Sequence, residues 1–127
     1  MDELISVVIP CYNDGIYLQE TFEKLKLQTY KYVEVIIVND GSTDEKTLQL
    51  LQQLSNEQNV RIIHKQNGKL PAARNSGIKE ARGNIIVTLD ADDYFEKTFF
   101  EKSLKILQQD NSIGSVISYT QNYDGNH

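Results

Sequence analysis

Three aspartates stand close together where an apolar segment ends. In the segment VTLDADD (87–93) an apolar run ends in three carboxylates, and in an extended chain Asp90 and Asp92 point to the same side. Two carboxylates about 4 Å apart repel by about 4 kcal/mol at an effective dielectric of roughly 20, against a total stability of roughly 5–15 kcal/mol. We therefore expect a ligand to offset this repulsion. Mg²⁺ or Mn²⁺ suits the position, because one or two carboxylates commonly hold these ions together with substrate phosphates.

Two other interpretations of the acidic cluster need to be considered. Asp93 could cap a helix that begins near Phe95, but a helix cap leaves Asp90 unexplained. The stretch DADDYFEKTFFE (90–101) also has acidic residues at positions 1, 3 and 12 of a calcium-binding loop. Aromatic residues stand at positions 5 and 6, where that loop needs an oxygen ligand and a glycine, so the pattern disfavours calcium.

A second carboxylate, Asp40, also follows an apolar run directly, in the segment VNDGSTD (38–44). A free carboxylate at a strand end can accept hydrogen bonds from the N–H groups of a base or from ribose hydroxyls. The residues after Gly41 are typical of a helix start, with Ser42 as the expected N-cap and Glu45 completing a capping box. Asp40 is therefore the candidate binding residue of this segment.

Arg74 is expected in the first turn of a helix whose first residue is Pro71. A cation there opposes the helix macrodipole by a few tenths to about 1 kcal/mol, and an anionic ligand would remove the conflict. Free N–H groups at the helix start together with a planar guanidinium suit a phosphate. The alternative is that Arg74 pairs with a carboxylate at the edge of the sheet.

Apolar runs and helical spacings alternate along the chain and predict the elements that position these residues. The expected strands are 5–9, 33–38, 60–64, 84–89 and 114–119. The expected helices lie between the strands. One runs over 71–81, and the other three have apolar stripes at Leu18, Phe22 and Leu25, at Leu48, Leu51 and Leu54, and at Phe100, Leu104 and Leu107. This alternation predicts a mostly parallel sheet in a three-layer α/β/α arrangement. Its strand-end loops PCYND, NDGSTD, KQNGK and DADD should converge at one edge, where ligands bind.

Composition excludes several classes of protein. The chain has 127 residues, 39% of them hydrophobic, which suits one domain with one core. A net charge of -5 without a basic helical face argues against a nucleic-acid partner. The acidic start and the lack of any apolar run near 20 residues predict no signal peptide or membrane span, and hence a cytoplasmic protein. The single cysteine, Cys11, excludes an internal disulfide and is expected to be a small buried residue.

Four segments together resemble the family 2 glycosyltransferases with a GT-A fold. They are VVIPCYND (7–14), VNDGSTD (38–44), NGKLPAARNSGIKEARG (67–83) and LDADD (89–93), and they occur in the order and approximate spacing of that family. The resemblance covers nearly the whole chain. It implies a Rossmann-like nucleotide-binding sheet and a hexosyltransferase-like enzyme of polysaccharide biosynthesis, which moves a sugar from a UDP-sugar to an acceptor hydroxyl with inversion.

The resemblance also implies roles for particular residues. Pro10, Cys11 and Tyr12 would line the nucleotide base, Asp40 would hydrogen-bond the uracil, and Arg74 would lie by the base and the diphosphate.

The same resemblance divides the acidic cluster. Asp90 would meet the ribose or the sugar, and Asp92 would hold Mn²⁺ or Mg²⁺, which bridges the diphosphate and stabilises charge on the departing UDP. Lys69 and Pro71 depart from the family pattern, which often has glycine and a small polar residue there, so phosphate contacts in this loop are expected to differ.

The polar segment TQNYDGNH that follows the last expected strand suggests a domain cut short at its C-terminal side. Residues 1–127 are expected to form one donor-binding domain without the acceptor half, inactive alone, with the catalytic base beyond His127. The acceptor would be a saccharide or a lipid-linked saccharide, and peripheral membrane association of the full-length protein stays open. One alternative is a stand-alone nucleotide-binding module without transfer activity. A phosphohydrolase of the haloacid dehalogenase type is disfavoured, because its DxD motif follows the first strand and not the fourth.

Overall fold

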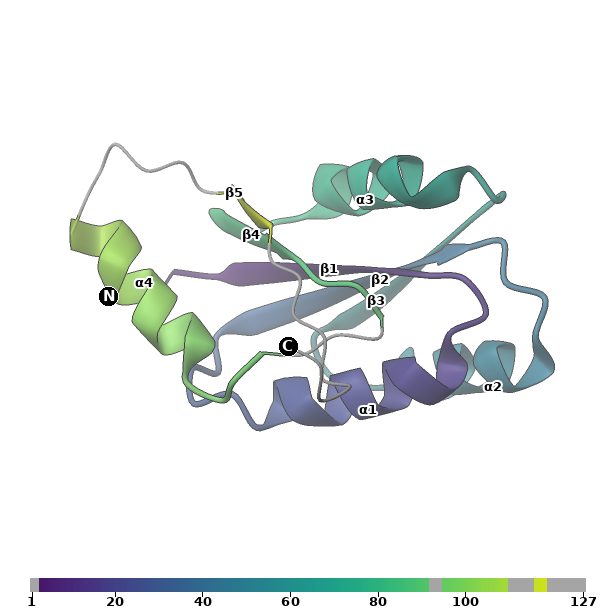
Figure 1. Ribbon diagram of the computed structural model, residues 1–127, viewed down its shortest axis with the longest axis horizontal. Helices are drawn as coiled ribbons and strands as arrows, with labels where there is room; N and C mark the ends of the chain where they lie inside the picture. Colours follow the sequence, from purple (N-terminus) through teal and green to yellow (C-terminus); the bar gives the residue numbers. More distant parts are fainter. Residues whose placement is uncertain (1–2, 92–94, 110–115, 119–127) are drawn as a thin grey trace, which may run out of the picture.

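A computed structural model describes residues 3–91, 95–109 and 116–118, which form a parallel sheet with helices on both faces (Figure 1). The strands are β1 (Ile5–Cys11), β2 (Val33–Asp40), β3 (Val60–Lys65), β4 (Ile85–Thr88) and β5 (Val116–Ser118). The helices are α1 (Gly15–Lys26), α2 (Glu45–Leu54), α3 (Lys69–Glu80) and α4 (Phe99–Gln109). The strand order is β3-β2-β1-β4-β5, and each described pairing is parallel. The predicted α/β class and the order of strands along the chain are confirmed, although β4 is shorter than expected; the ends of the last expected strand lie outside the described residues.

Strand β1 lies at the centre of the sheet and is buried along its whole length, because helices cover both of its faces. Val7 and Ile9 belong to the larger core, which includes residues of α1, α2 and α4. Val8 points to the opposite face, where it packs in a smaller core with Val38 and with Ala73 of α3. Figure 1 shows the same division, with α3 on one side of the sheet and α1 and α2 on the other. Alternation along a strand with both faces covered explains the continuous apolar runs.

Helix α3 lies close against this smaller core at Gly77. A Cβ atom added to Gly77 would stand 2.3 Å from Cγ1 of Val8 and 3.0 Å from Cγ2 of Val38. Ordinary contacts between carbon atoms are about 3.5–4.0 Å, so the missing side chain sets the distance between helix and sheet.

The start of α2 differs from the prediction. Its N-cap is Asp44, whose carboxylate accepts a hydrogen bond from the N–H of Thr47 at 3.0 Å, so the expected capping box at Ser42 is wrong. Ser42 belongs to the preceding loop instead: its N–H donates to Oδ1 of Asn39 and its hydroxyl accepts from the N–H of Asn13. Both residues are good caps by type, and these loop contacts decide between them.

The buried stripe of α2 is also displaced. Leu48 is 40% exposed, whereas Thr47 and the leucines of α2 at 50, 51 and 54 are buried. Positions 47, 50, 51 and 54 have the i, i+3, i+4, i+7 spacing of one helix face. For α1 and α4 the predicted core positions Leu18, Phe22, Phe100 and Leu104 are confirmed as buried. The side chain of Leu107 lies outside the described part.

Helix α3 begins at Lys69, two residues before the expected start at Pro71. Pro71 still lies in the first turn, where a missing N–H costs no intrahelical hydrogen bond. Arg74 therefore lies in the second turn, and the predicted conflict with the macrodipole is wrong, because that effect falls off within the first turn. The helix ends at Glu80, one residue earlier than predicted.

Helix α4 begins at Phe99 and not near Phe95, and Asp93, its predicted cap, lies outside the described residues. Gln28, which follows α1 and is buried, supports this helix start instead. Its carbonyl oxygen accepts from the N–H of Phe100 at 3.2 Å, and its amide donates to the carbonyl of Glu96 at 2.7 Å.

A buried polar cluster ties α3 to the amino ends of the strands. Glu34 of β2 is only 8% exposed, and its Oε2 accepts from the hydroxyl of Ser6 at 2.5 Å and from the N–H of Arg82 at 2.7 Å. The guanidinium of Arg61 lies 3.5 Å from Oε1. Burial alone would raise the pKa of Glu34, but these hydrogen bonds and the Arg61 charge together lower it. Glu34 is therefore ionised at neutral pH and has only donors around it.

We expect Glu34→Gln to lower the free energy of unfolding at pH 7 by about 1–3 kcal/mol, because its amide nitrogen must face one of these donors. The contribution of Glu34 is present above its unfolded pKa of about 4.3 and is lost as pH falls through its lowered folded pKa. Urea unfolding between pH 3 and 7 should therefore show a flatter acid decline in the variant. Glu23→Gln, at an exposed position of α1, is the control. Equal stability of both variants at pH 7 would contradict the structural role of Glu34.

Candidate functional site

The side chain of Asn13 joins the loops after β1 and β2. Oδ1 of Asn13 accepts hydrogen bonds from the N–H groups of Thr43 at 2.8 Å and Asp44 at 2.9 Å. Asn13 has a φ of 54°, a left-handed conformation that asparagine tolerates better than most residues. The sequence argument did not single out Asn13, although an asparagine in a turn is a known signal for such bonds to the backbone.

A pocket of about 290 Å³ opens at the carboxyl end of the central strands. It is lined by Pro10, Cys11, Tyr12, Asp14, Asp40, Asn67, Lys69 and Ala73. The structure thus brings together the four residues predicted for the base. Of the other lining residues, Asp14 belongs to the loop after β1, and the rest come from the loop after β3 and from α3. Three of the four predicted loops therefore contribute to one pocket.

Cys11 and Tyr12 line the pocket with side chains that differ in burial and polarity. Cys11 is buried, and this burial raises the pKa of its thiol to about 11, so it is an uncharged wall as expected for a small buried residue. The ring of Tyr12 is exposed beside the pocket. An aromatic ring in this position could stack on a planar base.

Asp40 ends β2 and is only 4% exposed. Its Oδ1 accepts hydrogen bonds from Nζ of Lys65 and from the N–H of Gly68, each at 2.8 Å. Burial would raise the pKa of Asp40, but Lys65 and the N–H groups of Gly68 and Lys69 lower it, which keeps the carboxylate ionised. The expectation of a free carboxylate is therefore wrong: Asp40 is paired with Lys65, a residue that the sequence argument missed.

Arg74 and Asp90 form an ion pair, with 2.7 Å between Nη2 and Oδ1, and neither residue lines the pocket. Both side chains are partly exposed. This arrangement confirms the alternative that Arg74 pairs with a carboxylate at the sheet edge. Within the described residues, Nε of Arg74 is buried and has no hydrogen-bond partner, so the guanidinium keeps a donor that the pair does not use.

The acidic segment turns sooner than predicted. Strand β4 ends at Thr88, and Ala91 lies in a turn. The chain is therefore no longer an extended strand at Ala91, contrary to the geometry assumed for Asp90 and Asp92. The hydroxyl of Thr21 in α1 donates to the carbonyl of Ala91 at 2.7 Å and draws the backbone toward α1. Asp92, the expected metal ligand, lies outside the described residues. Among residues 3–91, 95–109 and 116–118, no group of three or more His, Cys, Asp or Glu side chains could hold a metal.

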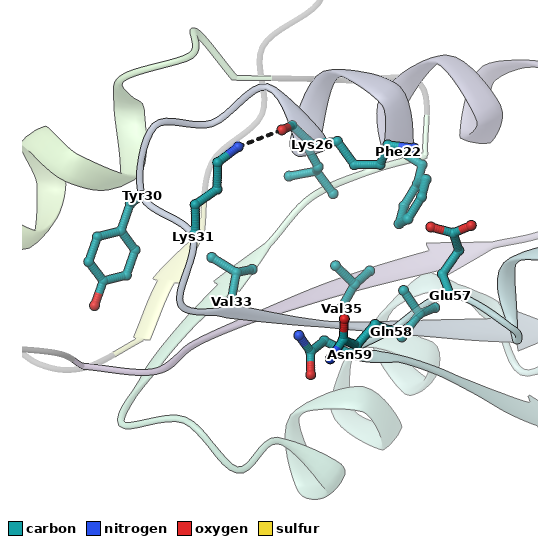
Figure 2. Close-up of a pocket in the computed structure, with 11 residues that line it drawn as sticks. Phe22, Lys26, Tyr30, Lys31, Val33, Val35, Glu57, Gln58 and Asn59 are labelled. Atoms are coloured by element: carbon teal, nitrogen blue, oxygen red, sulfur yellow. Dashed lines mark hydrogen bonds between the residues drawn. The ribbon is translucent and has the colours of Figure 1, made fainter.

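A second hollow, of about 200 Å³, lies between the end of α1 and the strands β2 and β3 (Figure 2). Phe22, Val33 and Val35 form its apolar wall, and Lys31 donates to the carbonyl of Lys26 at its rim at 2.8 Å. None of the predicted site residues lines it. The pocket beside Asp40 is therefore the candidate site.

Comparison with known proteins agrees with the motifs. Residues 6–127 match the family model described as Glycosyl transferase family 2. The chain belongs to this family. It is 38% identical to glycosyltransferase GlyG of Streptococcus pneumoniae over 130 residues, which are 99% of this chain and 43% of GlyG. An uncharacterized glycosyltransferase of Rickettsia felis is 41% identical over 118 residues, 93% of this chain and 19% of that protein. The family 2 domain thus spans less than half the length of these curated relatives.

Solved structures confirm the GT-A-like fold of this family 2 domain. TarS 1–349 of S. aureus in complex with UDP-GlcNAc superimposes with a TM-score of 0.74 at 30% identity, over 83% of this chain and 31% of that chain. The mannosyltransferase PcManGT from Pyrobaculum calidifontis, in complex with GDP-Man and Mn²⁺, has a TM-score of 0.76 at 21% identity, over 84% and 33%. Within the described part of this glycosyltransferase chain, no helix is both long and apolar enough to cross a membrane.

Proposed function

We propose that this glycosyltransferase domain binds a UDP-sugar and supplies the donor half of a reaction that moves the sugar, with inversion, to a hydroxyl of a saccharide or lipid-linked acceptor. The observation that carries the proposal is the pocket in which the base-lining residues and Asp40 meet. TarS, which was solved with UDP and with UDP-GlcNAc, supports UDP as the nucleotide.

The pocket offers complementary groups for each part of UDP. The ionised carboxylate of Asp40 accepts the ring N–H of uracil, and the ring of Tyr12 stacks on the base. Arg74 exchanges its pair with Asp90 for oxygens of the diphosphate, which matches a guanidinium fork. Asp90 is then free to accept hydrogen bonds from ribose or sugar hydroxyls.

The donor set also fits a divalent cation. Asp90 is a partly exposed carboxylate that already has a cation as its partner, and it lies two residues before Asp92, the proposed ligand of Mn²⁺ or Mg²⁺. Such ions need only one or two carboxylates when substrate phosphates complete the coordination. When bound, the cation stabilises negative charge on the leaving UDP.

Calorimetric titration with UDP and GDP tests this proposal. We expect UDP to bind more tightly than GDP, Mn²⁺ to strengthen the binding, and Asp92→Ala to remove the dependence on Mn²⁺. Glu20→Ala, at an exposed position of α1, should retain it. A preference for GDP, or UDP binding that ignores the metal in the unchanged protein, would overturn the assignment. A nucleotide-binding module without transfer activity would pass this test, but the full-length protein would then release no UDP from a UDP-sugar in the presence of an acceptor.

A further inference from the structure

One of the two carboxylate oxygens of Asp40 is already in use. A carboxylate has about four acceptor sites on its two oxygens. Nζ of Lys65 and the N–H of Gly68 both donate to Oδ1 at 2.8 Å. Asp40 lines the pocket and therefore offers a bound base one acceptor oxygen, Oδ2.

Bases differ in how many donors they present to such a group. Uracil presents one ring N–H between two carbonyl groups. Guanine presents a ring N–H and an adjacent amino group on one edge, which together match a carboxylate with both oxygens free. A donor that is desolvated in a pocket without a partner weakens binding, so a site with one acceptor rejects a base with two adjacent donors.

From these contacts we infer that Lys65 is a specificity-determining residue, which selects uracil over guanine by occupying Oδ1 of Asp40. The inference rests on the proposed binding of a nucleoside diphosphate in this pocket. The other donor to Oδ1, the N–H of Gly68, belongs to the backbone, so Lys65 is the donor that a change of side chain would remove.

The structure holds Lys65 firmly in this role. Lys65 is the last residue of β3 and is paired in register with Asp40, so the strand ladder fixes their separation. Its side chain is 21% exposed and also donates to the carbonyl of Gln66 at 2.6 Å, which leaves a third N–H for a carbonyl of the base. A Cβ atom at Gly68 would stand 2.7 Å from Nζ of Lys65, so the glycine leaves the space that the ammonium needs.

Comparing GDP with inosine diphosphate tests the inference without a change in the size of the base. Both bases are purines, and that of inosine diphosphate is guanine without the amino group. In calorimetric titrations of the unchanged protein, we expect it to bind about tenfold more tightly than GDP, which is the effect of one unpaired donor. Lys65→Met should reduce this ratio to near one. Lys65→Arg should preserve the ratio because it keeps a donor beside Oδ1, and so should Lys79→Met, at an exposed position of α3.

The outcomes separate the inference from the proposed function. Equal affinity of the unchanged protein for inosine diphosphate and GDP would overturn the role of Lys65, and so would an unchanged ratio in folded Lys65→Met. The comparison on the unchanged protein needs no variant to fold. A general loss of affinity through the missing charge affects both purine nucleotides alike and cancels in the ratio. Absence of UDP binding would instead overturn the proposed function.

Discussion

Asp40→Asn is expected to weaken UDP binding by about 10- to 150-fold, the effect of losing one hydrogen bond to a charged group at about 1.5–3 kcal/mol. The asparagine keeps the size of the side chain but brings an amide nitrogen into a site where Lys65 and Gly68 already donate to Oδ1. Either the donor Lys65 or the base then faces another donor. Calorimetric titration with UDP measures the loss, and circular dichroism checks that the fold is intact.

Asp44→Asn is the matched control, because Asp44 lies outside the pocket and asparagine is also a good N-cap for α2. Its UDP affinity should equal that of the unchanged protein. The pH dependence gives a second check: the lowered pKa of Asp40 means that its charge persists at pH 5 and is lost only as pH falls through that pKa. The ratio of UDP affinities between the unchanged protein and Asp40→Asn should therefore be constant between pH 5 and 7, because the terminal phosphate of UDP titrates in both. Unchanged affinity in folded Asp40→Asn would remove Asp40 from base recognition.

Gly77→Ala is expected to lower the free energy of unfolding by about 2 kcal/mol or more. The added methyl group would meet Val8 at 2.3 Å and Val38 at 3.0 Å, on two central strands that cannot retreat. Overpacking of this kind costs about 1–3 kcal/mol and occasionally more, which outweighs the gain of about 1 kcal/mol from helix propensity. Urea unfolding measures the change. UDP affinity should fall as well, because α3 carries Lys69 and Ala73 of the pocket.

The double variant Gly77→Ala/Val8→Ala controls for the cause. Val8→Ala alone should destabilise by leaving a cavity, but with Gly77→Ala the new methyl group occupies part of that space. The two changes should therefore be less destabilising together than the sum of their separate effects. Strictly additive effects would show that the steric contact at Gly77 is not the cause.

The structure could be predicted from the sequence where a single local pattern decided it and no contact from a distant residue intervened. The runs of β1 and β2 could be predicted because both faces of these strands are covered, and the convergence of their loops follows from parallel pairing. The cap of α2 could not be chosen, since Ser42 and Asp44 are both good caps and the deciding contact comes from Asn13 in another loop. The start of α3 could not be predicted, because Lys69 has a φ of 73° and a lysine gives no sequence signal for this left-handed conformation.

The candidate site shows the same limit. The four residues predicted for the base were named from motifs within single loops that resemble the family, but the partner of Asp40 depends on the register between β2 and β3. Register is a long-range property, so nothing near Lys65 in the sequence marks it as the partner of an aspartate 25 residues earlier. The pair of Arg74 and Asp90 was foreseen as an alternative, because a cation and a carboxylate were expected at the same sheet edge.

The uneven division of the core has a consequence for local unfolding. Helix α3 rests on the smaller core, which contains Val8, Ile36, Val38 and Ala73, whereas α1, α2 and α4 share the larger one. Elements with few buried apolar contacts open at lower free energy than the whole molecule does. The helix that carries Arg74 could thus open without disrupting the larger core, and a ligand that binds only its closed form would raise the cost of that opening. Donor binding and the local folding of α3 then become a single equilibrium.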